Sequence, residues 1–370
     1  MRVLHVITTI NRGGAENHLA ALVAEQVASG FCVTVAYLKG DGYWADKLGD
    51  LGVRVEHLGL RRYGEISPIK TLRALIRSLE PEIIHAHMPP AELYVRLALL
   101  FLDEATVMVI SKHNDEPFFR GTGQAVVGRW VSKRAVRMIA ISDAVNRYAG
   151  NNLSMPSERL KTVHYGIDPT PYDGFAKSQR DDVRAEWGIP SGAWVLGTVA
   201  RLVPQKALHV LLRAYAKYCA QARQESRLVM VGRGPLEDEL RALSRQLGLT
   251  DKIVWAGFRE DIPAVMVAFD AFALTSSYEG FGLVLLEAMA AARPVIASNV
   301  SAIPEIVQDG KTGMLCAPGD HEGFAQGFLC LEDADLRASL GAAGHERALI
   351  HFTIQRMADA TRTIYEECLA

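Results

Sequence analysis

The sequence predicts an α/β protein built from two doubly wound domains that face a central cleft. Three observations carry this prediction. The chain has 370 residues, more than one compact core usually holds, so two domains of roughly 150–200 residues are expected. Short, nearly all-apolar segments alternate with helical patterns, as in parallel sheets that helices cover on both faces. A turn-rich and then polar stretch interrupts this alternation, which afterwards starts again.

Composition excludes several other classes of protein. Hydrophobic residues make up 49% and charged residues 22%, which are globular values. The formal net charge of −2 is too little positive charge for a general nucleic-acid binder. The 5 cysteines are odd in number and form no C-x-x-C pair, so a reducing cytoplasm fits better than a disulfide scaffold or a zinc ribbon. The first residues lack the features of a signal peptide, and the longest apolar run, 93–102, is too short to span a membrane.

The first domain is expected over residues 1–170. Strands are predicted at 3–8, 32–38, 53–58, 83–86, 106–111 and 138–141, and helices at 15–29 and 68–80. The first of these helices carries Leu19, Leu22 and Val23 on one face and ends at Gly30. Because helices separate the strands, βαβ units with right-handed crossovers are expected.

A linker is expected over residues 171–190, because residues 168–182 are turn-rich and then polar. The second domain is expected over residues 191–350, and residues 351–370 are expected to form a C-terminal helix that packs back on the first domain. The strands of the second domain are predicted at 194–200, 228–231, 253–255, 271–274 and 294–297. In such sheets ligands bind beyond the carboxyl ends of the strands, which is where functional residues are sought.

The strongest functional signal runs from Glu279 to Glu287 and has the sequence EGFGLVLLE. A helix is expected to begin near Gly282, so Glu279 lies at its mouth and Glu287 about one and a half turns inside it. The amides of Phe281, Gly282 and Leu283 would then point out of the helix toward a diphosphate or toward sugar hydroxyls. Two other interpretations stay open. A glycosidase uses two carboxylates about 5–10 Å apart, and a glutamate near a helix N-terminus can simply stabilise the helix dipole.

Two cations, Arg201 and Lys206, follow the predicted strand 194–200. Their charge at the carboxyl end of a strand suits a diphosphate leaving group. The alternative is an ordinary solvated loop.

The segment Gly13-Gly14-Ala15-Glu16 follows the first strand and opens the first helix. It is not a G-x-G-x-x-G motif, so dinucleotide binding is weakly supported. A tight glycine turn that presents amides to an anion is the better interpretation, and a plain strand-to-helix turn is the alternative.

Histidines end two of the predicted strands. His113 follows the strand 106–111 and could hydrogen-bond a substrate hydroxyl, although a lone histidine is more often structural. His85 and His87 form an H-x-H pair, but a metal site would need a third ligand that the sequence does not place, so we expect a structural role and no metal.

Residues 124–137 predict a helix with Arg129, Lys133 and Arg137 on one stripe and with Trp130 among its apolar residues. This composition is found in helices that lie on anionic lipid, so peripheral contact with the inner face of the cytoplasmic membrane is one hypothesis. An ordinary surface helix is the other. Residues 118–121 just upstream are a candidate mobile acceptor loop.

Taken together, these motifs resemble the large retaining glycosyltransferase family 4, whose two Rossmann-like domains form the GT-B fold. The resemblance covers most of the chain, and the ordered set is more specific than any single piece. The matching residues are Gly13–Glu16, His113, Tyr165–Asp168, Arg201 with Lys206, Val231–Pro235, Glu279–Glu287, Pro294–Ile296, Pro304-Glu305, Asp309-Gly310 and Thr312-Gly313.

The resemblance implies a nucleotide-diphospho-sugar donor held mainly by the second domain and a glycan or lipid-linked acceptor on the side of the first. Glu279 would orient the transferred sugar and Glu287 would hold the ribose. Arg201 and Lys206 would neutralise the departing diphosphate, and His113 would touch the donor sugar. Further donor contacts are implied for Gly14, Gly232, Phe281, Gly282 and Leu283.

The resemblance also implies retention of the anomeric configuration and no need for a metal or another cofactor. We therefore expect a cytoplasmic hexosyltransferase that uses a UDP- or GDP-sugar in bacterial envelope polysaccharide or glycoconjugate synthesis, with closure of its domains. A nucleotide-sugar epimerase of the same architecture and a non-catalytic nucleotide-sugar-binding protein are the alternatives. Three positions depart from the family's pattern. Ala207 and Ser301–Ile303 replace expected glycines, and Arg233 stands where an acid is frequent.

Overall fold

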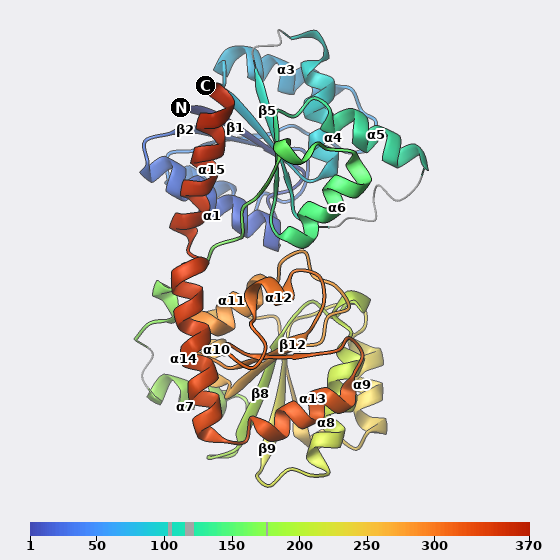
Figure 1. The fold of residues 1–370 in the computed structure, drawn as a ribbon, viewed down its shortest axis with the longest axis vertical. Helices are drawn as coiled ribbons and strands as arrows, with labels where there is room; N and C mark the ends of the chain where they lie inside the picture. Colours follow the sequence, from blue (N-terminus) through green and yellow to red (C-terminus); the bar gives the residue numbers. More distant parts are fainter. Residues whose placement is uncertain (103–105, 115–121, 175–176) are drawn as a thin grey trace. The chain divides into compact units, whose positions relative to one another are not determined.

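The computed structural model describes residues 1–102, 106–114, 122–174 and 177–370. The chain forms two compact units (Figure 1). The first contains Met1–Gly166 together with Ile354–Ala370, and the second contains Ile167–Thr353.

The first unit is built on a seven-stranded parallel sheet with the order β3-β2-β1-β4-β5-β6-β7. Its strands are β1 (Arg2–Ile7), β2 (Cys32–Tyr37), β3 (Arg54–His57), β4 (Ile83–His87), β5 (Val107–Lys112), β6 (Arg137–Ala140) and β7 (Leu160–Thr162). Its helices are α1 (Gly14–Ala28), α2 (Ala45–Asp50), α3 (Ser67–Leu79), α4 (Pro89–Ala98), α5 (Thr122–Ser132), α6 (Asp143–Leu153) and α15 (Ile354–Leu369), with short 3-10 turns η1 (Leu99–Phe101) and η3 (Ser157–Arg159).

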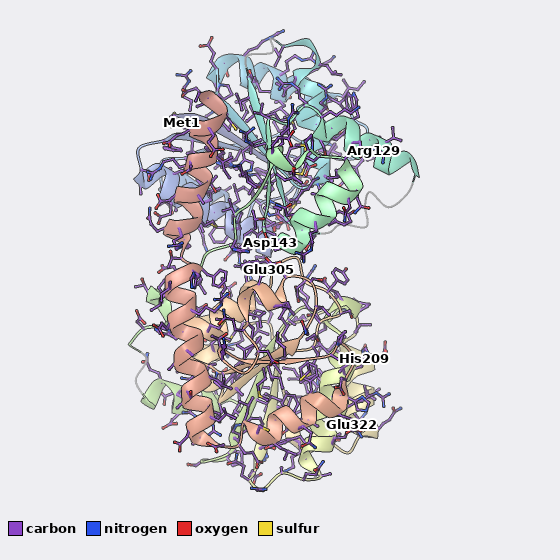
Figure 2. All side chains as sticks on the ribbon, in the orientation of Figure 1. Met1, Arg129, Asp143, His209, Glu305 and Glu322 are labelled. Carbon is purple, nitrogen blue, oxygen red and sulfur yellow. The ribbon has the colours of Figure 1, made fainter. Side chains whose placement is uncertain are left out.

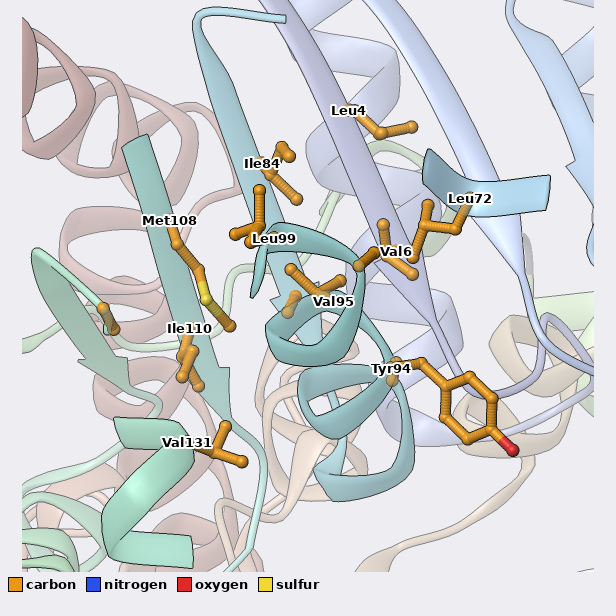
Figure 3. Packing of buried hydrophobic residues seen from close by; sticks show 14 of the residues in the cluster. Leu4, Val6, Leu72, Ile84, Tyr94, Val95, Leu99, Met108, Ile110 and Val131 are labelled. Atoms are coloured by element: carbon orange, nitrogen blue, oxygen red, sulfur yellow. The ribbon is translucent and has the colours of Figure 1, made fainter. Parts of the chain in front are cut away.

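Helices cover both faces of this sheet, as the continuous apolar strands predict. On one face, strand residues such as Val6 and Ile110 pack with Leu72 of α3, Val95 of α4 and Val131 of α5 (Figure 3). The opposite face packs against α1 and α15, which lie side by side (Figure 1). Because side chains alternate along a strand, the residues of β1 and β4 that are not in the first core point toward α1 and α15.

The second unit is built on a six-stranded parallel sheet with the order β10-β9-β8-β11-β12-β13. Its strands are β8 (Trp194–Val199), β9 (Ser226–Val231), β10 (Ile253–Gly257), β11 (Ala271–Leu274), β12 (Val295–Ser298) and β13 (Met314–Cys316). Its helices are α7 (Lys177–Glu186), α8 (Leu208–Cys219), α9 (Glu237–Gln246), α10 (Ile262–Ala268), α11 (Leu283–Ala290), α12 (Ile303–Ile306), α13 (His321–Cys330) and α14 (Ala334–His351), with 3-10 turns η4 (Thr170–Tyr172), η5 (Pro204–Lys206) and η6 (Thr250–Lys252).

The segment 171–190, expected to be a linker, contains the end of η4 and the whole helix α7. Arg184 of α7 binds the carboxylate of Asp270, with Nη2 2.9 Å from Oδ2, and the same carboxylate oxygen accepts the Val195 amide of β8. Asp270 therefore ties this polar helix to the sheet of the second unit.

The basic helix expected over residues 124–137 is shorter than predicted. Arg129 lies on α5 (Figure 2), but α5 ends at Ser132, and Arg137 begins β6. The single stripe of three cations is therefore wrong. Trp130 packs against the core, and the Arg96 guanidinium lies 4.5 Å from the centre of its ring, so this tryptophan belongs to the fold. The candidate acceptor loop 118–121 lies outside the described residues. Among the described residues, no helix is long and apolar enough to cross a membrane.

Candidate functional site

In the second unit, the loops after β8 and β11 meet at the carboxyl edge of the sheet, because these two strands are neighbours. Lys206, at the end of η5, places its Nζ 2.5 Å from Oε1 of Glu279. The same carboxylate oxygen accepts a hydrogen bond of 2.6 Å from the Ser276 hydroxyl. A backbone hydrogen bond joins the two loops further, since the Ser277 amide donates to the Gln205 carbonyl at 2.8 Å. Lys206 and Glu279, predicted from separate motifs, therefore form one contact.

Helix α11 begins at Leu283, one residue after the predicted start. Gly282 caps it with φ of 101°, a left-handed conformation that costs glycine little and other residues much more. The Phe281 side chain is buried against Phe352, so only its backbone can face a ligand. The first amides of α11 carry the positive end of its dipole.

Glu287 lies on α11 as predicted and is half-buried. Loss of hydration within the protein raises the pKa of its carboxyl group to about 7. The charge of Glu287 in turn helps to raise the pKa of Tyr172, although desolvation of that phenol is the larger cause. Glu287 therefore sits in a poorly hydrated environment in which an incoming hydroxyl would find a strong acceptor.

Gly232 follows β9 with φ of 129°, and a Cβ there would lie 2.0 Å from the Ala200 carbonyl oxygen. A Cβ at Gly234 would likewise come within 2.4 Å of the Leu202 oxygen. The backbone of this loop therefore lies directly against the loop that carries Arg201. Glycine is required here for that close approach, whatever further role the Gly232 amide has.

Arg201 lies in the same loop as Lys206 and is exposed. Neither a salt bridge nor a hydrogen bond of its guanidinium is found among the residues that the structure describes. Arg201 thus shares a loop with Lys206, but no hydrogen bond or ion pair joins its guanidinium to Lys206 or Glu279.

In the first unit, Gly14 is the first residue of α1, and Gly13 precedes it in extended conformation. Glu16 folds back over this turn. A Cβ at Gly13 would lie 2.3 Å from Glu16 Oε2, and the Thr9 hydroxyl donates to Glu16 Oε1 at 2.7 Å. The Glu16 carboxylate therefore lies at the turn where the sequence predicts that an anion binds.

His113 follows β5 at the carboxyl edge of the sheet and is buried. Both of its ring nitrogens are engaged. Nε2 lies 3.1 Å from Nδ1 of His87, and Nδ1 is hydrogen-bonded to the Tyr165 hydroxyl. Desolvation, with a smaller contribution from the Lys112 charge, lowers the pKa of His113 to about 3, so the ring is neutral at pH 7.

The sequence analysis missed a buried ion pair beside His113. Lys112 Nζ lies 2.7 and 2.5 Å from the two carboxylate oxygens of Glu92, at the start of α4. Both residues line a small pocket, with room for about one water molecule, together with Met88, His113, Asn114 and Tyr148. Met88 has φ of 70° and ψ of 143°, a conformation that non-glycine residues rarely adopt and that is often found at functional sites.

The sequence analysis also missed His5. In the register of the sheet, His5 of β1 lies opposite His85 of β4, so the third histidine that the H-x-H pair lacked comes from the neighbouring strand. Nitrogens of His5, His85 and His87 lie within 4.8 Å of one another. His5 Nδ1 is hydrogen-bonded to His87 Nε2 at 3.0 Å, and both nitrogens of His85 are bonded to hydroxyls, of Tyr365 and of Ser111.

Comparisons with known proteins agree with this architecture. A model of the family described as Glycosyltransferase Family 4 matches residues 12–170, and one described as Glycosyl transferases group 1 matches residues 179–347. The lipopolysaccharide core biosynthesis glycosyltransferase LpsE of Rhizobium meliloti is 26% identical over 358 residues, which cover 94% of each chain. The N-acetyl-alpha-D-glucosaminyl L-malate synthase of Bacillus anthracis is 27% identical over 292 residues, covering 78% of this chain and 75% of that one.

Two solved structures show the same fold. The crystal structure of Anabaena HepE in complex with UDP-glucose matches with a TM-score of 0.86 and 24% identity, over 99% of this chain and 100% of that one. Sucrose-phosphate synthase from Thermosynechococcus elongatus matches with a TM-score of 0.83 and 19% identity, over 99% of each chain. The prediction of the GT-B fold is therefore confirmed. Because the two family models together match nearly the whole chain in their expected order, this protein is a glycosyltransferase and belongs to glycosyltransferase family 4.

Proposed function

We propose that this glycosyltransferase moves a hexose from a UDP- or GDP-sugar to a glycan or lipid-linked acceptor in envelope polysaccharide or glycoconjugate synthesis. The observation that carries the proposal is the contact between Lys206 and Glu279 at the carboxyl edge of the second sheet. It joins a cation suited to a diphosphate with a carboxylate suited to sugar hydroxyls. The LpsE relative, whose name places it in lipopolysaccharide core biosynthesis, supports the biological setting.

The proposed roles follow from the position of each group. Lys206 and Arg201 stabilise the negative charge that grows on the diphosphate as the glycosidic bond breaks. Glu279 accepts hydrogen bonds from the transferred sugar, and Glu287 accepts those of the ribose. The backbone amides at the start of α11 add donors for the diphosphate. Such preorganised donors are most effective in a site from which water is excluded.

The reaction proceeds in this proposal with retention at the anomeric carbon, the donor phosphate accepting the proton of the acceptor hydroxyl. Two cations in the site provide the leaving-group stabilisation that a divalent metal provides in other enzymes. The acceptor lies on the side of the first unit, where the pocket beside His113 contains the Lys112–Glu92 pair. His113 contacts the donor sugar from this side.

The first experiment is a thermal-shift series with UDP-, GDP- and ADP-sugars, since a ligand that binds the folded state raises the melting temperature. We expect one base to stabilise the protein clearly more than the other two. Arg201→Ala should reduce this shift, whereas Arg213→Ala, a change on the outer part of α8, should leave it intact. No shift with any nucleotide sugar at millimolar concentration would contradict the proposal.

The second experiment uses the preferred donor with candidate acceptors. NMR of the product reports the configuration of the new bond, and we expect the configuration of the donor. Activity should persist after treatment with EDTA. Turnover of the nucleotide sugar to an isomer without any acceptor would instead support an epimerase.

A further inference from the structure

In the first unit, a continuous chain of hydrogen bonds runs from α1 through His113 and ends at Tyr165. It begins at Gln26 of α1, whose Oε1 lies 2.8 Å from His5 Nε2. His5 Nδ1 lies 3.0 Å from His87 Nε2, and His87 Nδ1 lies 3.1 Å from His113 Nε2. The last bond joins His113 Nδ1 to the Tyr165 hydroxyl. All four residues before Tyr165 are buried, and so is Tyr165 itself.

Each hydrogen bond of this chain has one proton available to it from the three histidines and Tyr165. Burial lowers the pKa of His5 to about 4, that of His113 to about 3, and that of His87 well below its usual value, so each ring is neutral and carries one N–H. Burial also raises the pKa of the Tyr165 phenol, which keeps its O–H. Three N–H groups and one O–H thus serve four bonds.

The chain has a direction, because the Gln26 oxygen can only accept. His5 must therefore donate through Nε2, which leaves its Nδ1 as the acceptor for His87 Nε2–H. The same logic makes His87 Nδ1 the acceptor for His113 Nε2–H. His113 Nδ1 is then left as an acceptor, and the Tyr165 hydroxyl donates to it.

We infer that Gln26, His5 and His87 are positioning residues that hold His113 with its proton on Nε2, and that the Tyr165 hydroxyl occupies the Nδ1 acceptor which a hydroxyl of the donor sugar takes during the reaction. This inference rests on the proposed contact between His113 and the donor sugar. A phenol and a sugar hydroxyl can each donate an O–H to an imidazole nitrogen, so the two can exchange at Nδ1 without a change of tautomer.

The surroundings of Tyr165 suit such an exchange. Its ring stacks on that of His18, with centroids 4.2 Å apart. The His18 ring also lies 5.5 Å from that of His113, and His18 Nδ1 has no hydrogen-bond partner among the described residues although it is buried. Tyr165 is also the last residue but one before the chain enters the second unit at Ile167. A movement of the backbone at this crossing would therefore shift the phenol relative to His113.

A metal ion bound by His5, His85 and His87 is the competing explanation of the histidine cluster. Such an ion would have to break the His5–His87 hydrogen bond and would add two positive charges to a buried site. Because hydrogen bonds already engage the nitrogens of these three rings, the chain explains their arrangement without an ion.

The first test is NMR of the full-length protein labelled with ¹⁵N-histidine, in which long-range proton–nitrogen spectra report the tautomer of each ring. We expect His5, His87 and His113 all in the Nε2–H form at pH 7, and a substantial Nδ1–H population at His113 in Gln26→Leu. His113 in the Nδ1–H form in the wild type would overturn the inference. If Gln26→Leu does not fold, the wild-type spectrum alone decides.

The second test compares two matched variants. Tyr165→Phe and Tyr365→Phe each remove a hydroxyl bound to Nδ1 of a buried histidine, but only the Tyr165 hydroxyl is bound to His113. Tyr165→Phe should lower KM for the donor about threefold to tenfold with kcat little changed, because the sugar no longer competes with a hydrogen bond. Tyr365→Phe should leave KM unchanged. An unchanged or raised KM in Tyr165→Phe would overturn the exchange.

Two further outcomes separate the competing explanations. Stabilisation of the wild type by Zn²⁺ that is lost in His5→Gln would overturn the chain in favour of a metal site. If no nucleotide sugar shifts the melting temperature, the proposed function fails, and with it the exchange at Nδ1. The tautomer measurement then still decides whether the positioning chain exists.

Discussion

Lys206 and Glu279 form a largely buried ion pair, with Nζ 2.5 Å from Oε1 and side chains 15% and 6% exposed. The two residues are 73 positions apart, and each follows a different strand of the same sheet. Removing one partner of such a pair leaves an uncompensated charge in a poorly hydrated place. In the proposed reaction the donor diphosphate competes with Glu279 for Lys206. The ion pair therefore stabilises the fold, and its lysine also supplies positive charge to the diphosphate.

Replacement of Lys206 by alanine should lower kcat more than it weakens donor binding. The reason is that the charge on the diphosphate grows as the bond breaks, so the cation contributes more in the transition state than in the ground state. We expect a loss in kcat of about 10²–10³-fold, measured by steady-state kinetics beside calorimetric titration of the donor. Lys217, which pairs with Glu322 on the exposed side of α8, is the control. Equal losses in kcat and donor affinity would contradict the proposed role.

The energy of the pair itself can be measured by a double-mutant cycle. Lys206→Met and Glu279→Gln should each reduce the free energy of unfolding by about 2–4 kcal/mol, because each leaves a buried charge without its partner. The double variant should lose clearly less than the sum of the two, since it leaves no uncompensated charge. Urea denaturation of the four proteins measures the coupling. Additive losses would mean that the contact contributes little in solution.

Sequence patterns predicted most of the fold because parallel strands buried on both faces are apolar throughout. They failed for α7, whose sequence KSQRDDVRAE has almost no apolar side chains. This helix is held instead by Arg180 and Arg184, which both bind Asp270. Its stability comes from a tertiary contact, which local hydrophobicity does not reveal.

The candidate site was predictable where one local motif carried it and was missed where strands had to be aligned. The positions of Glu279 and of the start of α11 follow from a strand, a glycine and a helix in immediate succession. His5 and His87 become partners only through the order and register of β1 and β4, which pair His5 with His85. If β1 and β4 were known to be adjacent, the matching positions of His5 and His85 would have predicted a histidine cluster.

Ala207 and Ser301, at positions where the resemblance implies glycine, adopt φ of 44° and 48°. A left-handed conformation costs a non-glycine residue about 1–2 kcal/mol, and glycine loses about 0.5–1 kcal/mol in chain entropy. Ala207→Gly should therefore raise the free energy of unfolding by about 0.5–1 kcal/mol. Because Ala207 follows Lys206, kcat should also be measured.

A matched control for this prediction is Ala216→Gly in the interior of α8. This residue is helical, so the same substitution should destabilise the protein by about 1 kcal/mol. Urea denaturation of both variants gives the comparison. Destabilisation by Ala207→Gly as large as that by Ala216→Gly would show that the left-handed backbone at residue 207 is not strained.

Glu287 makes stability depend on pH in a direction opposite to that of most carboxylates. Its pKa is about 7 in the folded protein against 4.5 for an ordinary glutamate, so between these values the folded state holds a proton that the unfolded state has released. The protonated carboxyl makes its full contribution to the free energy of unfolding below pH 4.5, and this contribution is lost as the pH rises to 7. The shift corresponds to a loss of about 3 kcal/mol over this window.

Glu287→Gln isolates this effect, because the amide does not titrate. The free energy of unfolding of the wild type, relative to Glu287→Gln, should fall as the pH rises from 4.5 to 7 and stay level above it. Urea denaturation at half-unit steps between pH 4 and 8.5 measures the difference, which cancels the titration of all other groups. A difference that instead grows with pH would mean that a neighbouring donor or cation stabilises the ionised carboxylate. Parallel curves would mean that Glu287 is as well hydrated in the folded protein as in the unfolded chain.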